Sequence, residues 1–194
     1  LHLLLYVNRL RLALQSRDEA TADRVFPGWR NLTIYSPKSS LHGDYLLTKA
    51  QYLNAKGSQD EGLSLVKKAI LSYQDAEEPQ GVARANAEFG VVMLSQGSIS
   101  SARDYFSIAS RTAAQIDDRR GALHAGILEL GTDITIGSLT RAREQAEILK
   151  AEAARLAVRQ EELYLDFVLG RLAFELGRYA EAEDIFSRSL CEAD

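Results

Sequence analysis

Four glycines recur at a constant interval of 40 residues, and this spacing constrains the fold more than any other feature of the chain. They are Gly57, Gly97, Gly137 and Gly177. Glycine readily adopts the left-handed backbone conformation in which many α-helices end. We therefore expect each glycine to form the same bend in one of several consecutive structural repeats.

Residues on either side of these glycines keep the same register. Small residues follow each glycine by five positions, at Gly62, Ala102, Ala142 and Ala182. Residues nine positions after each glycine are Val66, Phe106, Ala146 and Phe186. The pattern predicts pairs of antiparallel helices, in which the small residues allow close approach and the large ones fill the space between repeats. One such pair cannot bury its apolar face alone, so neighbouring pairs must stack.

The chain contains no proline between Gln80 and Asp194, and apolar residues recur there at helical spacing. Ser98 and Ser138 each follow a repeat glycine and are expected to be N-caps. A non-helical connection is expected over Phe26–Ser40, with the segment around Trp29 folding back over a helix. The predicted helices are Leu3–Gln15, Glu19–Phe26, Leu41–Lys56, Gln59–Gln74, Gln80–Gln96, Ile99–Ile116, Arg119–Ile136, Leu139–Ala157, Arg159–Leu176 and Tyr179–Leu190.

The pattern resembles the tetratricopeptide (TPR) repeat, most closely in its last unit. The matching residues there are Gly170, Gly177, Tyr179, Ala182, Phe186 and Ser189. The resemblance implies an all-α fold, a right-handed α-α superhelix of stacked helix pairs. The period of 40 residues is similar to the long repeats in sensor regions of maltose-regulator-type bacterial transcriptional regulators. Similar repeat lengths occur in peptide-responsive bacterial regulators and in some eukaryotic scaffolds. We expect one domain over residues 1–194, with helix pairs at 1–40 (divergent), 41–78, 79–118, 119–158 and 159–194.

Composition and charge restrict the environment and the partners. The net charge is −4, and no basic face suited to phosphate backbones stands out, so direct nucleic-acid contact is not expected. Cys191 is the single cysteine, which agrees with a reducing, cytoplasmic location. The apolar stretch Leu1–Val7 is too short to span a membrane. Because the sequence begins with Leu1 rather than Met, we expect either an excised piece of a longer protein or a chain that lacks its first residues.

No combination of residues predicts catalysis, and we expect the chain not to be an enzyme. Phosphate-binding loops, dinucleotide fingerprints and zinc-protease motifs are absent from the sequence. His2, His42 and His124 lack metal-ligand spacing, so neither a metal nor a cofactor is expected. The carboxylate pairs fall at expected helix starts or linkers, where they interact favourably with the helix dipole.

The first helix of each TPR-like pair lines the concave side of such a superhelix, and this side is our candidate binding surface. The residues expected to face it are Asp44, Gln51, Asn54, Arg84, Glu88, His124, Tyr164, Phe167, Arg171 and Glu175. Amides, isolated charges and aromatic rings together suit a peptide or a partner domain. We expect a non-catalytic protein-interaction scaffold. The alternative is an effector-sensing segment of a larger bacterial transcriptional regulator, and homodimerisation through the end faces stays open.

Overall fold

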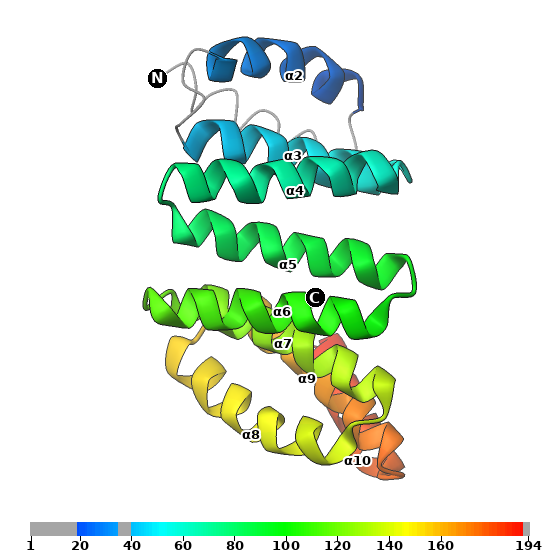
Figure 1. Ribbon diagram of the computed structural model, residues 1–194. Helices are drawn as coiled ribbons and strands as arrows, with labels where there is room; N and C mark the ends of the chain where they lie inside the picture. The colour runs from blue at the N-terminus through cyan, green and yellow to red at the C-terminus, as the bar shows by residue number, and fades with distance from the viewer. Residues whose placement is uncertain (1–18, 35–39, 192–194) are drawn as a thin grey trace. The chain divides into compact units, whose positions relative to one another are not determined.

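The computed structural model describes residues 19–34 and 40–191, and within these ranges every regular element is an α-helix. This confirms the predicted all-α class (Figure 1). The predicted helix Leu3–Gln15 lies outside the described residues. The helices are α2 (Glu19–Ile34), α3 (Ser40–Ala55), α4 (Gln59–Asp75), α5 (Pro79–Ser95), α6 (Ile99–Gln115), α7 (Arg119–Ile136), α8 (Leu139–Leu156), α9 (Arg159–Glu175) and α10 (Tyr179–Cys191).

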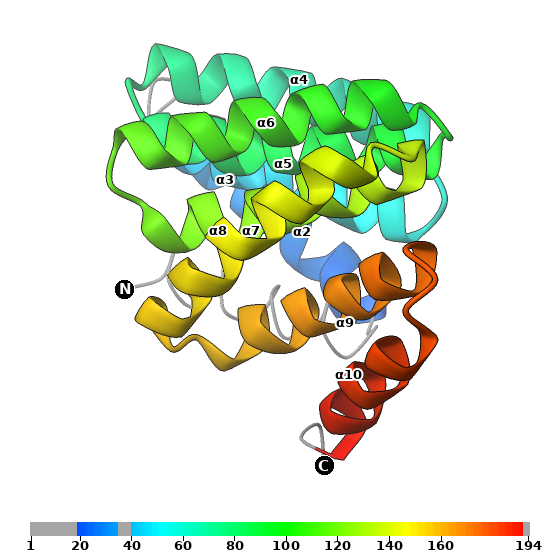
Figure 2. The same ribbon diagram turned by 90° about the horizontal axis from the view of Figure 1, so that it is seen from below.

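The chain divides into two compact units, Leu1–Val92 and Met93–Asp194, and the division falls inside α5. In the first unit, α3 and α4 run side by side as one helix pair (Figure 1). In the second unit, α9 and α10 form another pair through a tight bend (Figure 2). The expectation of a single domain over 1–194 stays a prediction.

The four repeat glycines occupy equivalent bends, as the sequence predicts. Their φ angles are +84° at Gly57, +77° at Gly97, +86° at Gly137 and +74° at Gly177. At each bend the glycine N–H and the next N–H donate to carbonyls of the preceding helix, for example Gly97 to Leu94 at 3.0 Å. These bonds satisfy carbonyl groups that the end of a helix would otherwise leave unpaired.

The prediction that Ser98 and Ser138 are N-caps is confirmed in position. Both serines occupy the N-cap position, but neither side chain makes a capping hydrogen bond. The Ser98 carbonyl instead accepts the Ala102 N–H at 2.9 Å, as the backbone of any residue can. Of the caps that the structure describes, Asp118 uses its side chain, which accepts the Gly121 N–H at 2.9 Å.

A second set of bends, between helix pairs, repeats with the same period but contains no glycine. Glu77, Asp117 and Ala157 have φ angles of +52°, +57° and +50°. A side chain in this left-handed conformation costs roughly 1–2 kcal/mol, and glycine avoids that cost. The repeat therefore continues in the backbone where the sequence gives no glycine signal.

We expect Ala157→Gly to raise the free energy of unfolding by about 0.5–1 kcal/mol, because glycine accepts the positive φ that alanine resists. The matched variant Gly137→Ala should lower it by about 1 kcal/mol for the same reason, since the space around Gly137 is open and strain alone acts there. Chemical denaturation of both variants measures the difference. If both variants change the free energy of unfolding in the same direction, the positive φ does not account for the stability at these two bends.

The small and large repeat positions pack as expected. Ala102, Ala142 and Ala182 are at most 2% exposed, and the Phe106 side chain is fully buried. A Cβ atom on Gly170 would lie 2.5 Å from the ring of Phe186, so that ring occupies space left by the glycine. In the second unit these contacts continue into an apolar core drawn from α7, α8 and α9.

The predicted non-helical connection over Phe26–Ser40 is wrong in its first part, because α2 continues through Pro27 to Ile34. Proline removes one backbone hydrogen bond, but the buried side chains of Phe26 and Trp29 keep the helix on α3. Trp29 packs edge-on against Tyr45 with ring centroids 5.8 Å apart, and Phe26 lies 5.2 Å from Tyr52. The segment around Trp29 thus covers a helix, as expected.

Candidate partner-binding faces

Five of the predicted binding residues gather on α3 and α5 in the first unit. We call this surface the α3/α5 face: Asp44, Gln51, Asn54, Arg84 and Glu88. Glu88 accepts hydrogen bonds from the Gln51 amide at 3.0 Å and from the Asn54 amide at 3.1 Å. Arg84 and Asp44, one full repeat period apart in sequence, form an ion pair of 2.8 Å. The prediction that these side chains share one surface therefore agrees with the structure.

Tyr73, which sequence reasoning missed, supports one end of this face. Its hydroxyl donates to Asp44 at 2.7 Å, and its ring packs where Gly43 and Gly81 leave room on α3 and α5. Burial, and then the hydrogen bond to Asp44, raise the pKa of Tyr73 far above its ordinary value. The hydroxyl thus stays protonated and holds the Asp44 carboxylate toward Arg84.

Gly62 supports the other end. A family-typical alanine at this position would collide with the Asn54 side chain, whose amide lies against the glycine. Without a Cβ at residue 62, the Asn54 amide can turn its Nδ2 toward Glu88. The departure from alanine in the repeat pattern therefore has a local structural reason, because it positions an asparagine on the α3/α5 face.

The remaining five predicted residues lie on α7 and α9 in the second unit. We call this surface the α7/α9 face: His124, Tyr164, Phe167, Arg171 and Glu175. The rings of His124 and Tyr164, also one period apart, have centroids 6.4 Å apart. Arg171 donates to the Thr135 hydroxyl at 3.2 Å. Glu175 is exposed, and within the described residues no interaction ties it to the other four.

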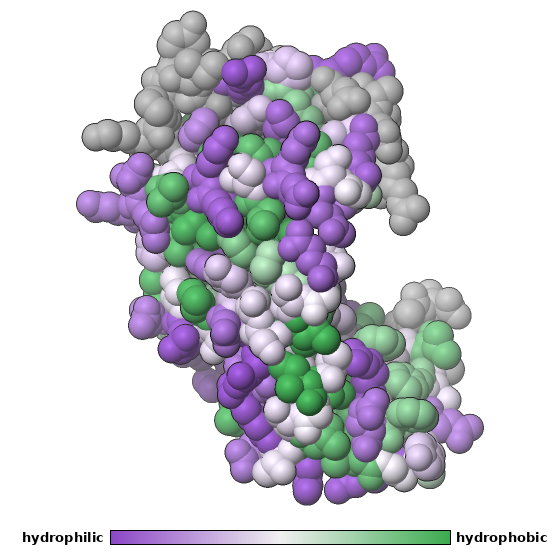
Figure 3. Space-filling view, turned by 45° about the vertical axis from the view of Figure 1, so that its right-hand side comes forward, coloured by the Kyte–Doolittle hydropathy of each residue, from purple (hydrophilic) through white to green (hydrophobic). Residues whose placement is uncertain are grey.

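Aromatic surface distinguishes the α7/α9 face from the α3/α5 face. Phe167 is 51% exposed and Tyr164 is 38% exposed, although Phe167 also contacts Phe186 with ring centroids 6.0 Å apart. Phe174, on the same helix, is 55% exposed. In the space-filling view, apolar patches are bordered by hydrophilic side chains on the side that it shows (Figure 3). Exposed rings framed by polar groups are typical anchor points for a partner.

The pKa of His124 on this face is lowered from its ordinary value. Burial lowers its pKa, Glu161 raises it by less, and Arg120 lowers it further. Glu161 is itself buried and receives the Arg120 Nε at 2.8 Å. This shift favours the neutral imidazole of His124 beside Tyr164, whose own pKa is raised by burial.

Two further observations concern metal ions and membranes. Across residues 19–34 and 40–191, no group of three or more histidine, cysteine, aspartate or glutamate side chains is placed to hold a metal ion. No helix in those same ranges is long and apolar enough to cross a bilayer.

No protein-family model matches the sequence, and no curated protein matches it. Solved structures, however, share its fold. The nearly identical TPR-like repeats of a kinesin light chain from Podosopora anserina give a TM-score of 0.74 at 13% identity, covering 98% of this chain and 94% of that one. Aspartyl phosphate phosphatase F from Bacillus subtilis gives 0.79 at 11% identity, covering 97% and 58%. The apo form of RapI gives 0.73 at 13% identity, covering 97% and 53%.

At these identities the likeness shows the fold alone, and the chain spans little more than half the length of the last two proteins. The α3/α5 and α7/α9 faces are thus carried by first helices of TPR-like repeats, as the sequence resemblance implies. The chain has the fold of TPR-like superhelical repeat proteins.

Proposed function

We propose that the chain is a non-catalytic interaction module that binds a peptide or a segment of a partner protein on its first helices. The observation that carries this proposal is the contact between equivalent positions of successive first helices, Asp44 with Arg84 and His124 with Tyr164. Such contacts place exposed amides, charges and aromatic rings in rows. A row of this kind offers hydrogen-bond partners and apolar anchor points to a chain laid across the helices.

The polar groups of the α3/α5 face are already paired with one another. This pairing favours selectivity between partners rather than high binding affinity. A partner there must replace or extend the bonds between Glu88, Gln51 and Asn54, so a poorly matched partner leaves polar groups unpaired. The exposed rings of the α7/α9 face require no such exchange. We infer that Phe167 and Tyr164 supply most of the affinity and that the polar residues supply discrimination.

Selection of peptides from a random library against the purified chain tests this function. Peptides that bind should lose about tenfold or more in affinity with Phe167→Ala, because truncation of an aromatic anchor costs at least about 1–2 kcal/mol. Ile148→Ala is the matched control, since Ile148 is 69% exposed on the second helix α8. Calorimetry measures both affinities. A loss at Ile148 but not at Phe167 would contradict the proposed surface and place binding on the second helices.

The second candidate is an effector-sensing segment of a larger cytoplasmic bacterial regulator. The 40-residue interval between equivalent bends favours it, as does a pocket of about 520 Å³ over α8, α9 and α10, a volume suited to a small effector. The full gene discriminates the two candidates, because a regulator would also encode a nucleotide-binding domain or a helix-turn-helix. Homodimerisation through the end faces, and the absence of direct nucleic-acid contact, stay predictions.

A further inference from the structure

Three arginines line a surface pocket formed by second helices of the second unit. The pocket has a volume of about 310 Å³ and lies against α6 and α8. Its lining contains Arg103 and Arg111 from α6, Arg141 from α8, and one acid, Asp104. None of these residues belongs to the α3/α5 or α7/α9 face. The site and its test are thus independent of the proposed function.

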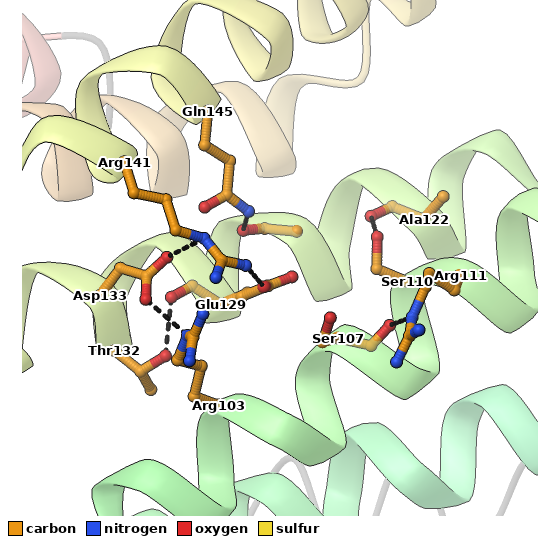
Figure 4. A network of polar contacts seen from close by, with 11 residues as sticks. Arg103, Ser107, Ser110, Arg111, Ala122, Glu129, Thr132, Asp133, Arg141 and Gln145 are labelled. Atoms are coloured by element: carbon orange, nitrogen blue, oxygen red, sulfur yellow. Dashed lines mark hydrogen bonds and ion pairs between the residues drawn. The ribbon is translucent and has the colours of Figure 1, made fainter. Parts of the chain in front are cut away.

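Two buried carboxylates of α7 hold the guanidinium groups of Arg103 and Arg141 in place (Figure 4). Asp133 has no exposed surface, and its two oxygens form ion pairs with Arg103 Nε at 2.7 Å and with Arg141 Nε at 3.1 Å. Glu129, also buried, receives Arg141 Nη2 at 2.6 Å. The carboxylates lie among the helices and the guanidinium groups extend to the surface, where Arg141 is 49% exposed.

The contacts with Asp133 and Glu129 leave several N–H donors of the arginines unused. Within the described residues, the two η nitrogens of Arg103 and Nη1 of Arg141 make no hydrogen bond to protein. Arg111 uses only its Nε, on the Ser107 carbonyl at 3.3 Å. A guanidinium is planar, so fixing one edge on a carboxylate also fixes the direction of its remaining N–H groups. The head of Arg141 is therefore oriented before any ligand arrives, and the ion pair with Asp133 restrains the head of Arg103, which reduces the entropy cost of binding.

We propose that this pocket binds a phosphoryl group, as free phosphate or as a phosphate ester, through Arg103, Arg111 and Arg141. A phosphoryl group carries three strong acceptor oxygens and about two negative charges, which match donors arriving from two helices. Ile108 is the one large apolar side chain in the lining, so an apolar ligand gains little there. Asp104 opposes indiscriminate anion binding and favours ligands that engage all three arginines.

Nuclear magnetic resonance on the ¹⁵N-labelled chain tests the proposal. Inorganic phosphate, titrated at constant ionic strength against chloride, should give saturable shifts in the amides of α6 and α8 and in arginine Nε–H signals. A peptide with one phosphoserine is the second arm, and tighter binding than that of phosphate would indicate a protein-borne ester. Comparable binding of the two would indicate free phosphate. No saturable shift with either probe, or equal shifts with chloride, would overturn the proposal.

Arg111→Gln should weaken binding about tenfold or more, because a hydrogen bond to a charged group contributes roughly 1.5–3 kcal/mol. This variant should fold normally, since Arg111 is exposed and its hydrogen bond goes to a backbone carbonyl of its own helix. The control is Arg155→Gln, which removes an exposed arginine from the same helix as Arg141 but outside the pocket. Equal weakening by the two variants would also overturn the proposal, because net charge alone would then explain the binding.

Discussion

Replacing Phe106 with alanine is expected to lower the free energy of unfolding by about 3–5 kcal/mol, one of the two largest effects expected for a single substitution in this chain. Phe106 is fully buried, and it stands at the large position of its repeat. Removal of the ring loses its transfer free energy and leaves a cavity that rigid helices fill only in part. Chemical denaturation measures the change directly.

Phe186→Ala is the matched control, because Phe186 stands at the same repeat position in the last helix pair. Its side chain is only partly buried, although its ring lies over Gly170. We expect a loss of about 1–2 kcal/mol, since a partly exposed ring loses less apolar contact on truncation. A loss equal to that of Phe106→Ala would mean that the repeat position, rather than burial, sets the stability.

Much of the fold was predictable because the repeat states the same information several times. Four glycines at one register point each to a bend, and a wrong interpretation of one would have conflicted with the other three. The predicted helix Arg119–Ile136 has the observed bounds, and most of the others differ by one or two residues. The pairing of Asp44 with Arg84 follows from the same period, because equivalent positions of neighbouring helices face one another.

The errors fall where a local signal competes with packing. Pro27 and Gly28 usually end a helix, yet α2 continues because Trp29 and Phe26 are buried against α3. The bend at Ala157 is left-handed without glycine, so no residue type marked it. At Pro27 the buried contacts compensate for a local cost of about 3 kcal/mol, and a sequence alone does not state those contacts. At Ala157 the positive φ costs about 1–2 kcal/mol.

The buried charge network was the main feature that sequence reasoning missed, although one signal was present. Asp133 stands where the other repeats carry Leu53, Met93 and Ala173. A charge at a position that is apolar in every other copy predicts either exposure or a buried pair. Identification of the partners as Arg103 and Arg141 requires the rotation of α6 and α8 about their axes, which the periodicity does not give.

Arg141→Ala is expected to lower the free energy of unfolding by about 2–3 kcal/mol at neutral pH. The arginine pairs with both Glu129 and Asp133, so its removal takes one cation from two buried carboxylates. Breaking a buried pair costs about 3–5 kcal/mol, and we reduce this value because Arg141 is half-exposed and Arg103 still pairs with Asp133. The matched control is Arg143→Ala, which removes an exposed arginine two residues along α8.

The loss of unfolding free energy caused by Arg141→Ala should become smaller as the pH falls. Burial raises the pKa of Glu129 and of Asp133, so the folded protein binds protons on these groups at a higher pH than the unfolded chain does. Without Arg141 both values should rise further. The variant then gains stability relative to the parent as the pH drops through the folded pKa values, until both carboxyls are protonated. Denaturation of the variant and the parent at neutral pH and at about pH 4 measures this change. If the difference in their free energies of unfolding is the same at both pH values, Arg141 contributes packing rather than charge.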